Sequence, residues 1–118
     1  MGAFRVDVTV SNPTERERSL TLPLLVDTGA TSTTLPREVA DALGLEPIDT
    51  RRVRLADGRE ERWPLAAILV RIDGQECPSL ALIGPPGGPA LLGAMTLEAM
   101  ALAVDPSAMR LIPTTFLV

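Results

Sequence analysis

The chain of 118 residues contains no histidine, no lysine and no tyrosine, and it has a single cysteine. Without histidine, neither a Ser-His-Asp triad nor a Cys-His pair can be assembled, and a zinc site with histidine ligands is excluded. Without lysine, Schiff-base chemistry and a P-loop lysine are excluded. Cys77 cannot form a disulfide within the chain. The acid–base groups that remain are mainly carboxylates, from seven Asp and eight Glu residues.

Charge and hydropathy narrow the choice of partners. The net charge of −4 disfavours nucleic acid, because binding to phosphates needs a basic surface. No apolar run approaches the roughly 20 residues that span a membrane. We therefore expect one cytoplasmic domain over residues 1–118, without nucleic acid, membrane, cofactor or metal.

Short apolar segments divided by Gly and Pro indicate many strands. Apolar and polar residues alternate over 4–10, which predicts a half-buried strand. Helices are predicted over 37–43, which Gly44 ends, and over 94–102, whereas 15–18 is predicted to be a charged loop or the end of a hairpin. Further strands are expected over 20–26, 52–56, 60–66, 67–72, 79–83, 91–93, 109–112 and 115–118. The pattern is typical of a mainly β domain that forms a closed or partly closed barrel with one or two short helices.

The segment Asp27-Thr28-Gly29-Ala30 follows the apolar run 22–26. A strand of this kind delivers a carboxylate toward an apolar interior, where a charge is costly unless it is satisfied. This placement predicts a functional acid. Considered alone, Asp27 could instead cap a turn.

The order of motifs resembles the retropepsin-like aspartic proteases. The string from Leu24 to Ala30 is followed by a hairpin with a Gly tip, then by Leu-Ile-Gly-Pro at 82–85 and Leu-Leu-Gly at 91–93 before a helix. This resemblance extends from Phe4 to about Pro106 and implies the acid-protease fold. Thr31 and Ala94 stand where retroviral enzymes carry a paired acid and Arg, which favours a cellular, non-viral branch.

Hydrolysis of a peptide without a metal or a nucleophile requires an acid and a base that act on one water. Two adjacent carboxylates supply both, because like charges so close together cannot both ionise and therefore share a proton. The chain has one Asp-Thr-Gly only. The resemblance thus implies a homodimeric aspartic endopeptidase, most active at mildly acid pH, in which Asp27 of each copy meets its symmetry mate.

The resemblance also implies roles for other residues. Thr28 would form a hydrogen bond across the dimer, Gly29 would present its backbone to the substrate, and residues 109–118 would help to form the dimer. The hairpin tip would be a flap over the bound peptide, and Leu91 would be a pocket wall. The residues expected to bind substrate are Ala30, Thr31, Ala56, Asp57, Gly58 and Leu91.

Two other functions remain open at this stage. The charged hairpin and Thr31 allow a non-catalytic homodimer that uses the same groove to bind a peptide or a protein partner. A monomeric β-barrel scaffold is a third possibility. Trp63 is either cover for the core or an anchor for substrate.

Overall fold

The computed structural model describes residues 3–118, so the first two residues of the predicted domain lie outside the described part. Most of the described chain is in strands, with two short helices, which confirms the mainly β prediction. The elements are β1 (Arg5–Asn12), β2 (Glu15–Val26), β3 (Thr33–Pro36), α1 (Arg37–Leu43), β4 (Asp49–Arg54), β5 (Glu60–Ile72), β6 (Gln75–Gly84), β7 (Leu91–Leu92), α2 (Ala94–Ala99), β8 (Leu102–Asp105) and β9 (Arg110–Pro113).

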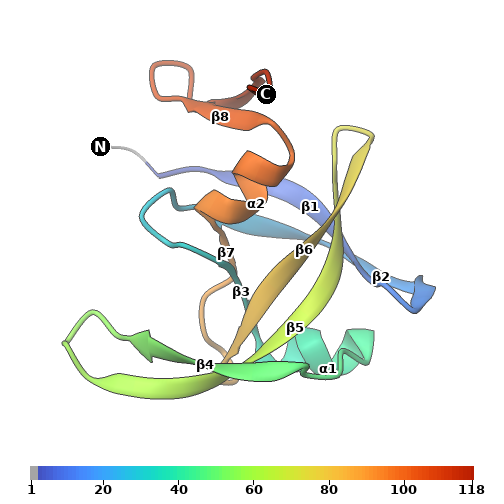
Figure 1. Ribbon diagram of the computed structural model, residues 1–118, viewed down its shortest axis with the longest axis vertical. Helices are drawn as coiled ribbons and strands as arrows, with labels where there is room; N and C mark the ends of the chain where they lie inside the picture. The colour runs from blue at the N-terminus through green and yellow to red at the C-terminus, as the bar shows by residue number, and fades with distance from the viewer. Residues whose placement is uncertain (1–2) are drawn as a thin grey trace.

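Seven strands form one sheet in the order β1-β2-β7-β3-β6-β5-β4, and β1 also pairs with β5. The pairing therefore returns to its first strand and leaves β4 outside the circuit. Two pairs are parallel, β2 with β7 and β3 with β6, whereas the others are antiparallel. The β4–β5 hairpin extends from the body, and β8 and β9 form a separate two-stranded sheet (Figure 1).

The core lies inside the circuit of strands. Val10 of β1 pairs with Val70 of β5, and both side chains are fully buried. Since the side chains of a strand alternate between its two faces, every second residue of these strands points inward. The helices close the core with Leu43 from α1 and with Leu97 and Met100 at α2. Aliphatic side chains thus fill the interior, as the low aromatic content requires.

Several local predictions are confirmed. Helix α1 spans residues 37–43, and Gly44 ends it with φ 66°. This left-handed conformation is one that glycine adopts without a steric penalty. The turn at Asp73-Gly74 joins β5 to β6 with φ values of 50° and 82°, as expected for a tight hairpin.

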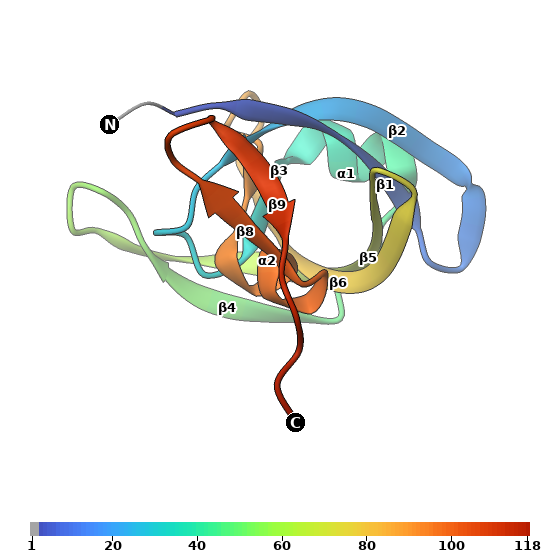
Figure 2. The same cartoon turned by 90° about the horizontal axis from the view of Figure 1, so that it is seen from above.

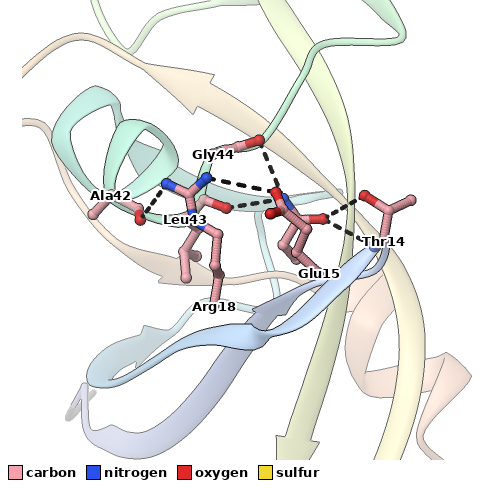
Figure 3. Close-up of polar contacts among 7 residues, drawn as sticks. Thr14, Glu15, Arg18, Ala42, Leu43 and Gly44 are labelled. Carbon is pink, nitrogen blue, oxygen red and sulfur yellow. Dashed lines mark hydrogen bonds and ion pairs between the residues drawn. The ribbon is translucent and has the colours of Figure 1, made fainter.

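For residues 15–18, predicted to be a charged loop or the end of a hairpin, the structure shows the hairpin, because β2 begins at Glu15 and pairs with β1. The side chains of residues 15–18 are all exposed, so the segment shows no alternation of apolar and polar residues. Hydrogen bonds to the C-terminus of α1 hold it in place (Figure 3). Arg18 Nη2 donates to the Ala42 carbonyl at 3.1 Å. Buried Asn12 donates to the carbonyls of Leu43 and Gly44 at 2.9 and 3.1 Å. These bonds satisfy carbonyls that the end of a helix leaves without partners.

The C-terminal predictions need two corrections. The second helix stops at Ala99 rather than at residue 102, because Ala101 takes a left-handed φ of 53° and Leu102 enters β8. The predicted strand over 115–118 is absent: these residues have no regular structure and are exposed. Figure 2 shows this C-terminal tail leading away from the body of the molecule.

Candidate active site

Asp27 follows the last residue of β2, and its backbone is fixed by the neighbouring strand. The Asp27 N–H donates to the Leu92 carbonyl at 3.0 Å, and the Val26 N–H donates to the Phe4 carbonyl at 2.9 Å. The parallel pairs Leu25–Leu91 and Val26–Leu92 place the second apolar-Gly segment directly beside the Asp-Thr-Gly segment. Two distant parts of the sequence thus form one structural unit, which a linear motif search cannot reveal by itself.

The Asp27 side chain is partly buried rather than sunk in the apolar interior, which corrects the sequence-based expectation. Its Oδ1 accepts a hydrogen bond from the Gly29 N–H at 3.0 Å. The Asp27 carbonyl accepts from the Ala30 N–H at 3.1 Å. The carboxylate therefore lies in a tight turn, held at one oxygen and partly open to solvent.

Helix α2 secures the rest of the Asp27 loop, which we define as residues 27–32. The Ala94 N–H donates to the Ala30 carbonyl at 2.8 Å, and the Met95 N–H donates to the Thr31 carbonyl at 3.0 Å. Gly93 lies so close that a Cβ added to it would be 2.4 Å from the carbonyl carbon of Ser32. Only glycine fits at this position, because any side chain would collide with backbone.

The predicted supporting residues face solvent within the single chain. Thr28, Gly29 and Thr31 are exposed, and Ala30 is partly buried. Leu91 is partly buried and pairs with Thr34 of β3. Their contacts with a substrate or a second copy stay predictions, since these contacts involve groups outside the chain.

The β4–β5 hairpin carries the other predicted site residues at its tip. Leu55 and Arg59 close the turn through a bond from the Leu55 N–H to the Arg59 carbonyl at 2.8 Å, and Gly58 has φ 89°. Ala56, Asp57 and Gly58 are all exposed. Both views place this tip on the same side of the molecule as the Asp27 loop (Figures 1 and 2).

Arginines and acids hold each other in place along this hairpin. The Arg59 N–H donates to Asp57 Oδ1 at 3.0 Å, and Arg59 Nε donates to Oδ2 at 2.7 Å. Both bonds lower the pKa of Asp57, and the backbone bond has the larger effect. The pKa of Asp49 is lowered chiefly by the hydrogen bond from the Arg51 side chain. Arg54 pairs with Glu60 at 2.8 Å.

Trp63 lies near the base of the hairpin and is partly buried. Its indole ring would be 3.3 Å from a Cβ added at Gly84, and its Nε1 donates to Glu61 at 2.9 Å. This packing against the end of β6 favours the first of its two predicted roles, as cover for the core.

A cavity of about 300 Å³ lies elsewhere in the molecule. It contains none of the predicted site residues, and its walls come from the β1–β2 turn, the end of α1 and the approach to β4. Its lining residues are Asn12, Pro13, Thr14, Glu15, Gly44, Leu45, Glu46, Ile48 and Ala67. Among residues 3–118, no three His, Cys, Asp or Glu side chains gather as a metal site would need, and no helix is long and apolar enough to cross a membrane.

Comparison with known proteins identifies the family. The family model described as Aspartyl protease matches residues 6–96, which is most of the chain, so the chain belongs to the aspartyl protease family. The matched segment includes the Asp27 loop, the β4–β5 hairpin and the Leu91–Gly93 segment, and it ends before β8. No curated protein sequence matches the chain.

A solved structure supports the same fold. The EIAV protease in complex with the inhibitor HBY-793 superposes with a TM-score of 0.62 over 82% of this chain and 86% of that one, at 15% sequence identity. At this identity the likeness establishes the fold alone. Together with the family match, it confirms the retropepsin-like assignment made from the sequence.

Sequence reasoning missed the residues that hold the site from behind. Thr33 and Thr96 are buried and hydrogen-bonded to each other. Thr33 and Thr96 are separated by more than sixty positions, so no local pattern connects them. The one available signal was the density of hydroxyl side chains over 31–34, which directly follow the Asp-Thr-Gly-Ala motif.

Proposed function

We propose that this protein is a homodimeric aspartic endopeptidase, in which Asp27 of both subunits activates the water that attacks the peptide bond. The observation that carries the proposal is the Asp27 loop itself. A partly exposed carboxylate from an Asp-Thr-Gly sequence is held by backbone bonds to β7 and α2 in a chain of the aspartyl protease family.

The chemistry requires a second carboxylate. One ionised oxygen takes a proton from water while the protonated partner polarises the scissile carbonyl. The sequence contains one Asp-Thr-Gly, so a single copy offers one such carboxylate. A two-fold axis that passes beside Asp27 supplies the missing group, since a residue near such an axis meets its own copy.

An exposed apolar tail supports association of two copies. Phe116 is 63% exposed and Leu117 is 95% exposed. Exposed apolar side chains that lie next to each other are typical of surfaces that contact another protein. We assign residues 109–118 to the dimer contact and the tip residues 56–58 to a flap over the bound peptide.

The decisive experiment compares wild type with Asp27→Asn in a cleavage assay on a mixed peptide library at mildly acid pH. Asp27→Asn keeps the size of the side chain but removes the charge, and we expect activity to fall about 10³-fold or more. Asp73→Asn is the matched control, because it changes an exposed turn residue whose φ of 50° suits Asn equally well. Equal activity in wild type and Asp27→Asn would contradict the proposal.

The alternative is a non-catalytic homodimer that binds a peptide or a partner. The exposed Thr31 and the charged hairpin favour it over a simple scaffold, because they offer polar contacts to a bound chain. Peptide binding by wild type and Asp27→Asn alike, without cleavage by either, would establish this alternative.

A further inference from the structure

Behind the Asp27 loop, three hydroxyl side chains from separate elements form a continuous chain of hydrogen bonds. Thr33 Oγ1 lies 2.7 Å from Thr96 Oγ1, which lies 2.8 Å from Ser79 Oγ. The Gly93 N–H donates to Thr33 Oγ1 at 3.2 Å. This hydroxyl chain, defined as Ser79, Thr96 and Thr33, joins β6, α2 and β3.

Counting protons fixes the direction of these bonds. Each hydroxyl donates once and can accept twice. Thr33 and Thr96 are at most 1% exposed, whereas Ser79 is partly exposed. If Thr33 donates to Thr96 and Thr96 donates to Ser79, the last proton lies where water can accept it. The opposite direction would leave the Thr33 proton buried without a partner, which is costly.

Two members of the hydroxyl chain, Thr33 and Thr96, lie at the two places that hold the Asp27 loop. Thr33 directly follows the loop, and its hydroxyl receives the N–H of Gly93, the residue packed against Ser32. Thr96 lies in the first turn of α2, next to Ala94 and Met95, whose N–H groups bind the carbonyls of the loop. Movement of Thr96 would therefore shift the loop through both contacts.

We propose that Ser79, Thr96 and Thr33 are positioning residues, whose bonded hydroxyls set the location of the Asp27 loop on α2. The inference rests on the proposed function in one respect: it takes Asp27 as the reacting group. None of the three hydroxyls is hydrogen-bonded to Asp27, so they act through the loop. Displacements of about 1 Å at a reacting group reduce rates by as much as about 100-fold.

The first test uses amide hydrogen exchange, which requires no catalytic activity. In Thr96→Val the methyl groups keep the volume but the hydroxyl is lost. We expect the amides of Ala30, Ala94 and Met95 to exchange about tenfold faster or more, while the amides of the β1–β5 pair keep their wild-type rates. Thr96→Ser should restore slow exchange, because it keeps the hydroxyl.

Two further variants keep the test decisive. Ser79→Ala changes the partly exposed end of the chain, so it tests the same idea if Thr96→Val fails to fold, and it should speed exchange at the same amides by a smaller factor. Thr21→Val removes an exposed hydroxyl that bonds to Thr9 at 2.8 Å on the β1–β2 pair. This control should leave the loop amides unchanged.

Peptidase kinetics give the second readout. We expect Thr96→Val to lower kcat about 10- to 100-fold with KM within about twofold of wild type, and Thr96→Ser to recover most of kcat. If wild type cleaves nothing, the proposed function fails while the exchange data still decide the positioning role. Unchanged exchange at the loop in both Thr96→Val and Ser79→Ala, or equal effects of Val and Ser at residue 96, would overturn the proposal.

Discussion

The Asp27 loop and the tip of the β4–β5 hairpin lie on the same side of the molecule, yet different forces hold them. The loop is fixed by backbone bonds to β7 and α2, by the close contact at Gly93 and by buried hydroxyls. The hairpin tip is held by backbone bonds within its own turn and by exposed ion pairs, such as Arg59 with Asp57. Buried bonds are costly to break, whereas exposed ion pairs contribute little.

Under the proposed function, this difference is the one expected between a reacting group and its cover. A catalytic carboxylate must keep one position, because the attack geometry tolerates little error. A flap must open and close, so weak and solvated contacts suit it. The comparison implies that changes at the loop reduce stability and rate together, whereas changes at the hairpin mainly alter substrate binding.

The largest effect is expected from Gly93→Ala. The added Cβ would lie 2.4 to 2.7 Å from the backbone of Ser32 and Thr33, so the loop or α2 must shift. We expect a loss of about 3 kcal/mol in the free energy of unfolding, measured in urea.

Gly58→Ala at the hairpin tip is the variant to compare with Gly93→Ala at the loop. Gly58 has φ 89° and open space around it, so only the backbone strain matters. We expect a loss of about 1 kcal/mol in the free energy of unfolding. Equal losses for the two variants would show that the loop is no more constrained than the tip.

A smaller effect is expected from Glu60→Gln, which removes the pairs with Arg52 and Arg54 at 3.9 and 2.8 Å. Both Arg side chains are more than 70% exposed and Glu60 is 42% exposed, so the free energy of unfolding should change by less than about 0.5 kcal/mol. The KM for charged peptides should change more than the stability does. A loss above about 1.5 kcal/mol would contradict the assignment of the hairpin as a loosely held cover.

The smallest expected effect is the dependence of stability on pH. The pKa of Asp57 is lowered by hydrogen bonds from the Arg59 backbone and side chain, and the pKa of Asp105 is lowered chiefly by the Ser107 hydroxyl. A lowered folded-state pKa gives stability that is present above the ordinary value of 3.8 and is lost as pH falls through the folded value. Between pH 7 and about 5 these contributions should therefore persist.

Thermal unfolding of wild type and Asp57→Asn, followed by circular dichroism, checks this expectation. The difference in unfolding temperature between the two should be the same at pH 7 and about 5, and it should vanish well below pH 4, where Asp57 is protonated in both states. A difference that shrinks between pH 7 and 5 would contradict the assigned direction.

Much of this molecule follows from local sequence patterns. The alternation in β1, the Gly44 stop of α1 and the Asp73-Gly74 turn could all be predicted, because each depends on neighbouring residues. The parallel pairing of Leu25 and Val26 with Leu91 and Leu92 could not, because it joins distant parts of the sequence. The choice between a loop and a hairpin strand over 15–18 could not be made from the sequence, because long-range bonds from Asn12 and Arg18 to α1 hold this segment. Nor could the early end of α2 be predicted, where a non-glycine residue, Ala101, adopts positive φ.

The candidate site also has a part that the sequence predicts and a part that it does not. Asp27 and its loop are evident from the motif, since the chemistry needs those residue types in that order. The hydroxyl chain behind the loop could not be predicted, because its members come from β6, α2 and β3 and meet only in the folded chain.

Subunit mixing tests the shared active site most directly. A fixed amount of wild type is allowed to exchange subunits with Asp27→Asn, and peptide cleavage is then measured. If each site needs Asp27 from both copies, random pairing lowers activity to about one half at equal amounts and to about one tenth at ninefold excess of the variant. Mixing with Asp73→Asn should cause no such loss. Activity that stays constant as Asp27→Asn is added, despite confirmed exchange, would contradict a site built from two copies of Asp27.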